Sequence, residues 1–130
     1  MKDDIKEIIY SFEGKLVGNK RMKNLVSQTL SLMPENIIDK VTKTCWFVSS
    51  FEDAWAFTFT GNDLKNQHLI FLSDHLLNEH VYQIRYTIAH EIGHVILGHR
   101  NSTLIKQTKE EIRKQEEEAD NFAKLYISEY

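Results

Sequence analysis

The sequence predicts an α+β domain, and three features carry that prediction. Apolar residues recur at helical spacing near both ends of the chain, the middle holds short runs rich in aromatic residues and threonine, and turn residues separate these segments. With 130 residues, of which 42% are hydrophobic and 27% charged, the chain is long enough for one domain spanning residues 1–130. The expected order is helices, a small sheet and two further helices.

The bulk composition excludes several classes of protein. A net charge of −3 does not favour nucleic-acid binding, and no apolar run approaches the length of a membrane span. The N-terminus, MKDDIKEII, lacks the pattern of a signal peptide, so we expect a cytoplasmic protein that contacts neither membrane nor nucleic acid directly. The single cysteine, Cys45, lies in the apolar run CWFV and is expected to be a buried hydrophobe. The oligomeric state is left open.

Three helices are expected in the N-terminal part. Apolar spacing predicts helices over Lys2–Phe12 and Lys20–Leu32, with Gly14 and Gly18 bracketing a loop between them. Pro34 is expected at the first position of a third helix, where its missing N–H leaves no hydrogen bond unmade.

Three strands follow, over Cys45–Val48, Ala54–Thr60 and His68–Leu72. The links between them are too short for crossover helices, so the sheet is expected to be antiparallel. Both tryptophans are expected in its core. Ser73 and Asp74 then suit the start of a short helix.

The next helix, predicted over Val81–Leu97, contains the sequence H-E-I-G-H. Its isoleucines recur at helical spacing, so one side is buried, and the two histidines fall on another side. Because positions four apart share a face about 6 Å along the axis, His90 and His94 could bind one Zn²⁺ together. Glu91 could then take a proton from the water that such a metal activates. Gly98 is expected to end the helix.

A catalytic zinc site of this kind needs a third protein ligand and one open position. The pattern H-E-x-x-H-x-x-G-x-x-H would supply a histidine, but this chain has Leu97 and Arg100 at the required positions. His99 is instead expected at the helix end, near the C-terminal carbonyls. The other source is an acid on the last helix, predicted over Thr108–Ser128.

Helical phase selects among those acids. Apolar residues recur every seven positions and mark the expected buried stripe: Ile105, Ile112, Ala119 and Tyr126. At about 100° per residue, Glu116 lies roughly 40° from Ile112, whereas Glu117 and Glu118 point more than about 100° away. Glu116 is therefore the expected third ligand, because a carboxylate turned inward needs a partner. Asp120, one turn later, is placed to hydrogen-bond the outer nitrogen of a ligand histidine.

The segments HEIGHVILGH and EEEADNFA together resemble the ImmA/IrrE-type zinc metallopeptidases, whose pattern is H-E-[LI]-G-H and then E-x-E-A-[ND]-x-F-A on the next helix. The resemblance implies a zincin-like fold of the gluzincin type, in which zinc is bound by three side chains: His90, His94 and Glu116. It also implies that Glu91 is the catalytic base. Asp120 takes the Asn/Asp position of the pattern, and Glu118 matches its second acid and is the reserve candidate for the ligand.

The same resemblance implies how a substrate binds. The strand before the motif helix, here His68–Leu72, would lie at the sheet edge and pair with an extended peptide. Targets among relatives are often transcriptional repressors, which implies a regulatory protease with a narrow protein substrate. Many relatives carry a helix-turn-helix region, and this sequence shows none, so direct DNA binding is not expected.

Two hypotheses follow. The first is a zinc endopeptidase, in which Tyr86, His99 or Tyr126 could assist the metal in stabilising the oxyanion. The second is a zinc-binding regulatory or interaction module with little or no peptidase activity. Its site would be closed by a fourth protein ligand, for which His99, Glu118 and Asp120 are the spare groups.

Overall fold

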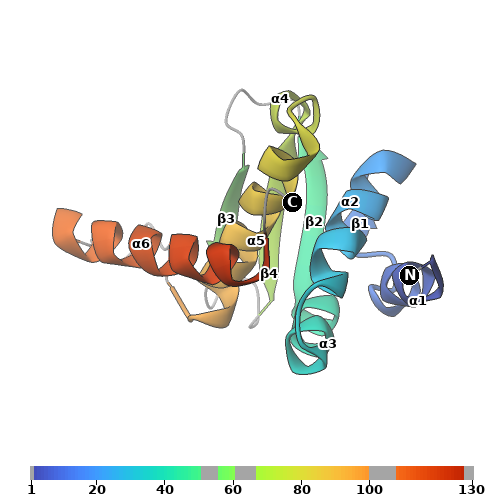
Figure 1. Cartoon of the computed structure of the whole chain (residues 1–130), viewed down its shortest axis with the longest axis horizontal. Helices are drawn as coiled ribbons and strands as arrows, with labels where there is room; N and C mark the ends of the chain where they lie inside the picture. Colours follow the sequence, from blue (N-terminus) through green and yellow to red (C-terminus); the bar gives the residue numbers. More distant parts are fainter. Residues whose placement is uncertain (1, 51–55, 61–66, 100–107, 128–130) are drawn as a thin grey trace.

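The computed structural model describes residues 2–50, 56–60, 67–99 and 108–127. The elements are α1 (Lys2–Ser11), β1 (Leu16–Val17), α2 (Lys20–Ser31), α3 (Glu35–Thr44), β2 (Cys45–Ser50), β3 (Ala56–Thr60), β4 (His68–Ser73), α4 (Asp74–Leu77), α5 (Val81–Ile96) and α6 (Lys109–Tyr126). They form the expected α+β arrangement of helices around a small sheet (Figure 1). No helix in these ranges combines the length and the apolar character that crossing a membrane requires.

The sheet is mixed, so the prediction of an antiparallel sheet is wrong. The strand order is β1-β2-β4-β3, in which β1, β2 and β4 run parallel and only β3 is antiparallel to its neighbour. The prediction assumed that strands joined by short links lie side by side. Here β3 does not pair with β2. The position beside β2 is occupied by β4, which lies between β2 and β3. A short link suffices for this, because skipping one strand spans only about 10 Å.

This order also overturns the expectation that His68–Leu72 lies at the sheet edge. β4 pairs with β2 along its whole length, from Cys45 opposite His68 to Ser50 opposite Ser73, and with β3 on its other side. The outer strand on that side is β3. The first two residues of the strand predicted from position 54 lie outside the described residues, and β3 begins at Ala56.

Two local predictions in the N-terminal part also change. The loop expected between Gly14 and Gly18 contains β1, whose buried Leu16 pairs with Phe47 of β2. This strand could not be predicted, because a strand of two residues is too short to show a periodicity in the sequence. Pro34 has extended backbone angles, φ −61° and ψ 153°, and is therefore the N-cap of α3 rather than its first helical residue.

One face of the sheet is built into the core. Cys45 and Phe47 of β2 and Ile70 and Leu72 of β4 are all fully buried there. Burial raises the pKa of the Cys45 thiol to about 12, in keeping with the predicted role as a small hydrophobe. Trp46 points to the opposite face and is 38% exposed, so its predicted core position is wrong.

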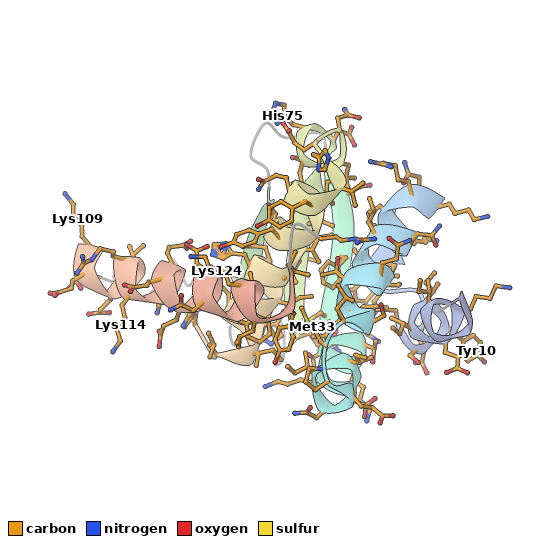
Figure 2. The ribbon with its side chains drawn as sticks, viewed as in Figure 1. Tyr10, Met33, His75, Lys109, Lys114 and Lys124 are labelled. Carbon is orange, nitrogen blue, oxygen red and sulfur yellow. The ribbon has the colours of Figure 1, made fainter. Side chains whose placement is uncertain are left out.

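The two C-terminal helices differ in how they are embedded. The apolar side of α5 is buried as predicted, at Ile84, Ile88, Ile92 and Val95. In α6 the buried residues lie only in its second half, at Ala119, Phe122 and Ala123. Its first half extends beyond the sheet (Figure 1), with Lys109 and Lys114 reaching outward from it (Figure 2). Ile112 of the predicted stripe is 47% exposed, and Ile105 lies outside the described residues.

Candidate metal centre

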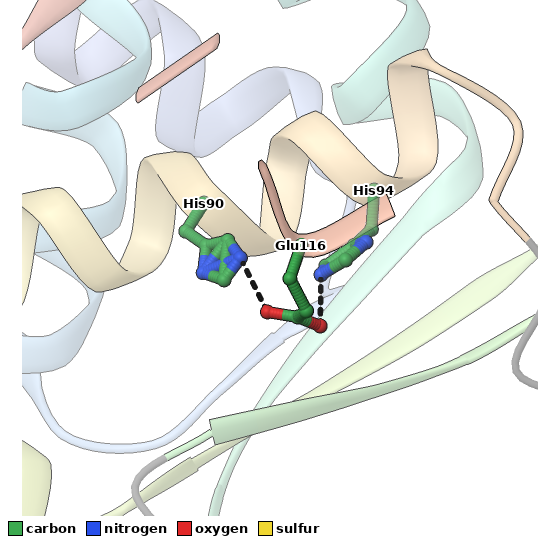
Figure 3. Close-up of side chains that lie close together, drawn as sticks. All are labelled: His90, His94 and Glu116. Carbon is green, nitrogen blue, oxygen red and sulfur yellow. Dashed lines mark ion pairs between the residues drawn. The ribbon is translucent and has the colours of Figure 1, made fainter. Parts of the chain in front are cut away.

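Three side chains from α5 and α6 converge on one point (Figure 3). The Nε2 atom of His90 lies 3.0 Å from Oε2 of Glu116, and Nε2 of His94 lies 3.2 Å from Oε1 of the same carboxylate. One ligand atom from each residue can be chosen so that all lie within 4.8 Å of one another. The group could therefore hold a metal ion, and it is the set that the sequence predicts.

Helix α5 fixes the two imidazoles. His90 and His94 are one turn apart, with ring centroids 4.8 Å apart, and both turn Nε2 toward α6. The buried residues Ile88, Ile92 and Val95 anchor the opposite side of the helix in the core. The histidines are thus held by a rigid buried element rather than by a loop.

The glycine of the motif lets α6 approach. A Cβ atom on Gly93 would lie 3.1 Å from Cδ1 and 3.2 Å from Cβ of Phe122 on α6. Phe122 therefore packs directly on the α5 backbone at this point, between the two histidine-bearing turns. This close contact brings the preceding turns of α6, including Glu116, over the imidazoles.

Glu116 is turned toward the histidines, as its helical phase predicts, but it is not buried. Its side chain is 52% exposed, whereas those of His90 and His94 are 18% and 7% exposed. Helical phase places Glu116 near Ile112, and both residues are about half exposed on α6. Glu117, which the phase argument rejected, is exposed as well.

The residues present suit a metal such as zinc. The buried Nε2 atom of His90 makes no hydrogen bond to any described residue, despite its short distance to Glu116. Burial, followed by the nearby His90 and His99, lowers the pKa of His94 to about 4, which favours the neutral imidazole that a metal requires. Two neutral imidazoles and one carboxylate are an established donor set for zinc.

The outer nitrogen of His90 faces an acid, as predicted, but at long range. Oδ1 of Asp120 lies 3.9 Å from Nδ1 of His90, which exceeds hydrogen-bond distance. The same oxygen accepts a hydrogen bond of 3.1 Å from the hydroxyl of Tyr86. Burial and then the charge of Asp120 raise the pKa of Tyr86 to about 12, so the phenol stays protonated as a donor.

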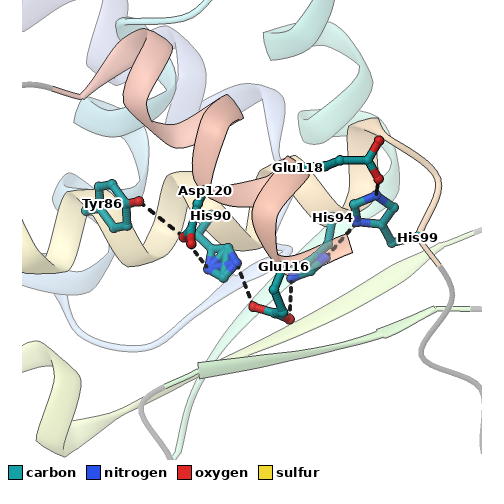
Figure 4. A network of polar contacts seen from close by, with 7 residues as sticks. All are labelled: Tyr86, His90, His94, His99, Glu116, Glu118 and Asp120. Carbon is teal, nitrogen blue, oxygen red and sulfur yellow. Dashed lines mark hydrogen bonds and ion pairs between the residues drawn. The ribbon is translucent and has the colours of Figure 1, made fainter. Parts of the chain in front are cut away.

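The outer nitrogen of His94 has a different partner, which the sequence reasoning missed. Its Nδ1 lies 2.9 Å from Nδ1 of His99, and Nε2 of His99 lies 3.1 Å from Oε1 of Glu118 (Figure 4). His99 is buried, and both of its ring nitrogens are engaged by these two residues. It is therefore more than the helix-end residue near the C-terminal carbonyls that the sequence predicted.

A local signal in the sequence explains this contact. Gly98 has φ +71° and follows the last turn of α5, where its N–H donates to the carbonyl of Val95 and the N–H of His99 donates to the carbonyl of His94. These two bonds form a Schellman motif, in which the residue after the glycine folds back on the third residue from the helix end. Those residues are His99 and His94, so the segment H-V-I-L-G-H carries the contact.

Four other candidates can be placed. Glu91 follows His90 on α5 and is buried, with 7% exposure. Tyr126 packs edge-to-face on Phe122, with ring centroids 5.2 Å apart. Tyr86 and His99, two residues considered for the oxyanion, use their polar atoms in the contacts to Asp120, His94 and Glu118 described above.

Comparison with known proteins gives one match. The family model described as Peptidase U49 matches residues 53–129, more than half of the chain, including α5 and α6 and therefore all three converging side chains. No curated protein and no solved structure was found to be similar.

Proposed function

This chain belongs to the Peptidase U49 family, and from that premise we propose that it is a zinc-dependent endopeptidase with a site of the ImmA/IrrE type. The observation that carries the proposal is the convergence of His90, His94 and Glu116 within 4.8 Å of one another, on the two helices that the family match covers. The family supports hydrolysis of peptides, and the donor set supports the metal.

Three protein ligands leave room for catalysis. Zinc is commonly four-coordinate, and catalytic sites keep one position open for water or substrate. The spare groups that could close the site are used elsewhere: His99 and Glu118 bond each other, and Asp120 accepts from Tyr86. This arrangement favours an open site over the closed one of a structural zinc.

Zinc bound here would polarise the scissile carbonyl and lower the pKa of a nearby water to about 7. Glu91 is the acid that the motif places beside the first histidine, and we assign it the role of accepting the proton and passing it to the leaving amine. Its burial suits that role, because electrostatic interactions are stronger in a site shielded from bulk water.

The substrate we propose is an extended protein segment. β3 is the outermost strand on its side of the described sheet, and it lies against α5, the helix that carries the histidines. An extended peptide could add to that edge through backbone hydrogen bonds and so reach the metal from a defined direction. This replaces β4 as the docking strand, and the narrow specificity of a regulatory protease would come from pockets along the edge.

The test combines metal content with cleavage of a mixture of proteome-derived peptides, read by mass spectrometry. The wild type is expected to bind one zinc per chain and to cut peptides. Glu91→Gln should keep the zinc and lose cleavage by about 10²-fold or more. Glu117→Gln, an equal charge change on an exposed acid, should keep both.

Absence of zinc after reconstitution, or full cleavage by Glu91→Gln, would contradict the proposal. Stoichiometric zinc with no cleavage of any peptide would favour the second candidate, a zinc-binding interaction module. The observation that favours this second candidate is the half-exposed Glu116, since an accessible ligand could be replaced by a carboxylate of a bound partner.

A further inference from the structure

We infer that His99 and Glu118 are positioning residues, which hold the His94 ring in the tautomer whose Nε2 lone pair faces the metal. The inference rests on the proposed metal site and extends it. It starts from two distances: 2.9 Å between Nδ1 of His94 and Nδ1 of His99, and 3.1 Å between Nε2 of His99 and Oε1 of Glu118.

The carboxylate sets the direction of this chain of bonds. An ionised Glu118 can only accept, so Nε2 of a neutral His99 must carry the proton that it donates. Nδ1 of His99 is then a bare acceptor. Nδ1 of His94 must supply the proton across the 2.9 Å contact, and this leaves Nε2 of His94 with a lone pair directed at Glu116 and the metal position.

The opposite arrangement is unfavourable for neutral rings when a metal occupies the site; in the metal-free protein it competes, because Nε2–H of His94 could then donate to Oε1 of Glu116 at 3.2 Å. If His94 carried its proton on Nε2, its Nδ1 would accept and His99 would have to donate from Nδ1. The bare Nε2 of His99 would then face the carboxylate of Glu118 at 3.1 Å, lone pair against lone pair. The His99 side chain is only 7% exposed, so water has little access to its side of that contact, whereas the Glu118 carboxylate is 46% exposed.

The two metal-binding histidines are therefore supported unequally. His94 has a bonded chain of two residues behind it, whereas His90 has Asp120 at 3.9 Å and depends on Tyr86 to orient that acid. Figure 4 shows the two supports on either side of Glu116. We expect removal of the His99 support to weaken metal binding more than removal of the Tyr86 support.

The first experiment measures zinc affinity by competition with a chromophoric chelator. His99→Ala is expected to lower the affinity by about 10- to 100-fold, and Glu118→Ala by about 10-fold. His99→Asn, whose amide oxygen can still accept from His94, should restore most of the loss. Glu117→Ala is the matched control, because it removes a neighbouring exposed acid and should bind zinc as the wild type does.

The second experiment needs no metal. Ring ¹⁵N shifts of the histidines, recorded by NMR on metal-free Glu116→Ala, which lacks the competing acceptor for Nε2, should show the His94 proton on Nδ1. A mixture of tautomers is expected when His99→Ala is added. Thermal unfolding of the metal-free variants controls for folding, and Glu118→Ala keeps the test usable if His99→Ala does not fold.

The outcomes separate the two proposals. A wild type that binds no zinc contradicts the proposed function, while the tautomer measurement still judges the inference. A His94 proton on Nε2 in metal-free Glu116→Ala, or zinc affinity and tautomer both unchanged by His99→Ala and by Glu118→Ala, would overturn the inference and leave the zinc site standing.

Discussion

Helices α5 and α6 both supply side chains to the candidate metal centre, but they are held in place in different ways. Eight residues of α5 are buried, including His94 and Glu91, whereas α6 is buried only at Ala119, Phe122 and Ala123. The imidazoles are therefore carried by a buried helix, and the carboxylate comes from a helix that is buried only in its C-terminal half. Metal affinity should depend on the anchoring of α6, and overall stability on the packing of α5 and of the buried residues that anchor α6.

Removing the carboxylate should give the largest effect. Glu116→Ala leaves two imidazoles, too few for a stable zinc site, so the protein should lose its bound zinc altogether. Elemental analysis of the dialysed protein measures this, with Glu117→Ala as the control. Zinc retained in Glu116→Ala but lost in Glu118→Ala would show that the reserve acid is the ligand.

Weakening the contact between α6 and α5 should give the next largest effect, a loss of stability. Phe122→Ala removes the aromatic ring that packs on Gly93, and a change of this kind destabilises a protein by about 3–5 kcal/mol. Leu125→Ala on the same helix is the control, because Leu125 is 74% exposed and should change stability by less than about 0.5 kcal/mol. Urea unfolding of metal-free protein gives both values, and equal values would contradict this account of the anchor.

One chemical change made on each helix sharpens the contrast. Ile88→Ala on α5 empties a fully buried site and should destabilise the protein by about 2–5 kcal/mol. Ile112→Ala on α6 removes a side chain that is 47% exposed, and should change stability by about 0.5 kcal/mol or less. A large loss in Ile112→Ala would mean that the outer half of α6 is packed against a surface in solution.

The smallest change in stability is expected for Gly93→Ala. Alanine favours a helix by about 1 kcal/mol over glycine, which offsets part of the strain from a Cβ atom 3.1 Å from Phe122. Phe122 must then shift by a few tenths of an ångström, and we expect a lower zinc affinity at nearly unchanged stability. Unchanged affinity together with a more stable protein would show that the close approach is not needed.

The sequence predicted α5 well because one physical signal governs it. Its isoleucines lie on the core side, so the phase of the helix and the direction of His90 and His94 follow from spacing alone. The same logic worked for Glu116 only in part. It selected the acid that the structure turns toward the histidines, but it assumed that Ile112 marks a buried stripe. The part of the helix that extends beyond the sheet has no core to pack against at that position.

The sheet order and the support of His94 could not be predicted by the same route. Periodicity shows which face of a strand is buried but not which strand is its neighbour, so the insertion of β4 between β2 and β3 left no trace in the pattern. The His99 contact was accessible in principle, through the Schellman motif at Gly98. Its continuation to Glu118 depends on how α6 crosses α5, which is a tertiary property.

The outer strand β3 has a consequence for the behaviour of the protein in concentrated solution. Within the described sheet it is hydrogen-bonded on one side, to β4, and its sequence AFTFT carries no charge. An uncharged outer strand rich in aromatic residues can recruit a strand from another molecule as readily as one from a substrate. Self-association should therefore rise with protein concentration and fall when a peptide occupies the same edge.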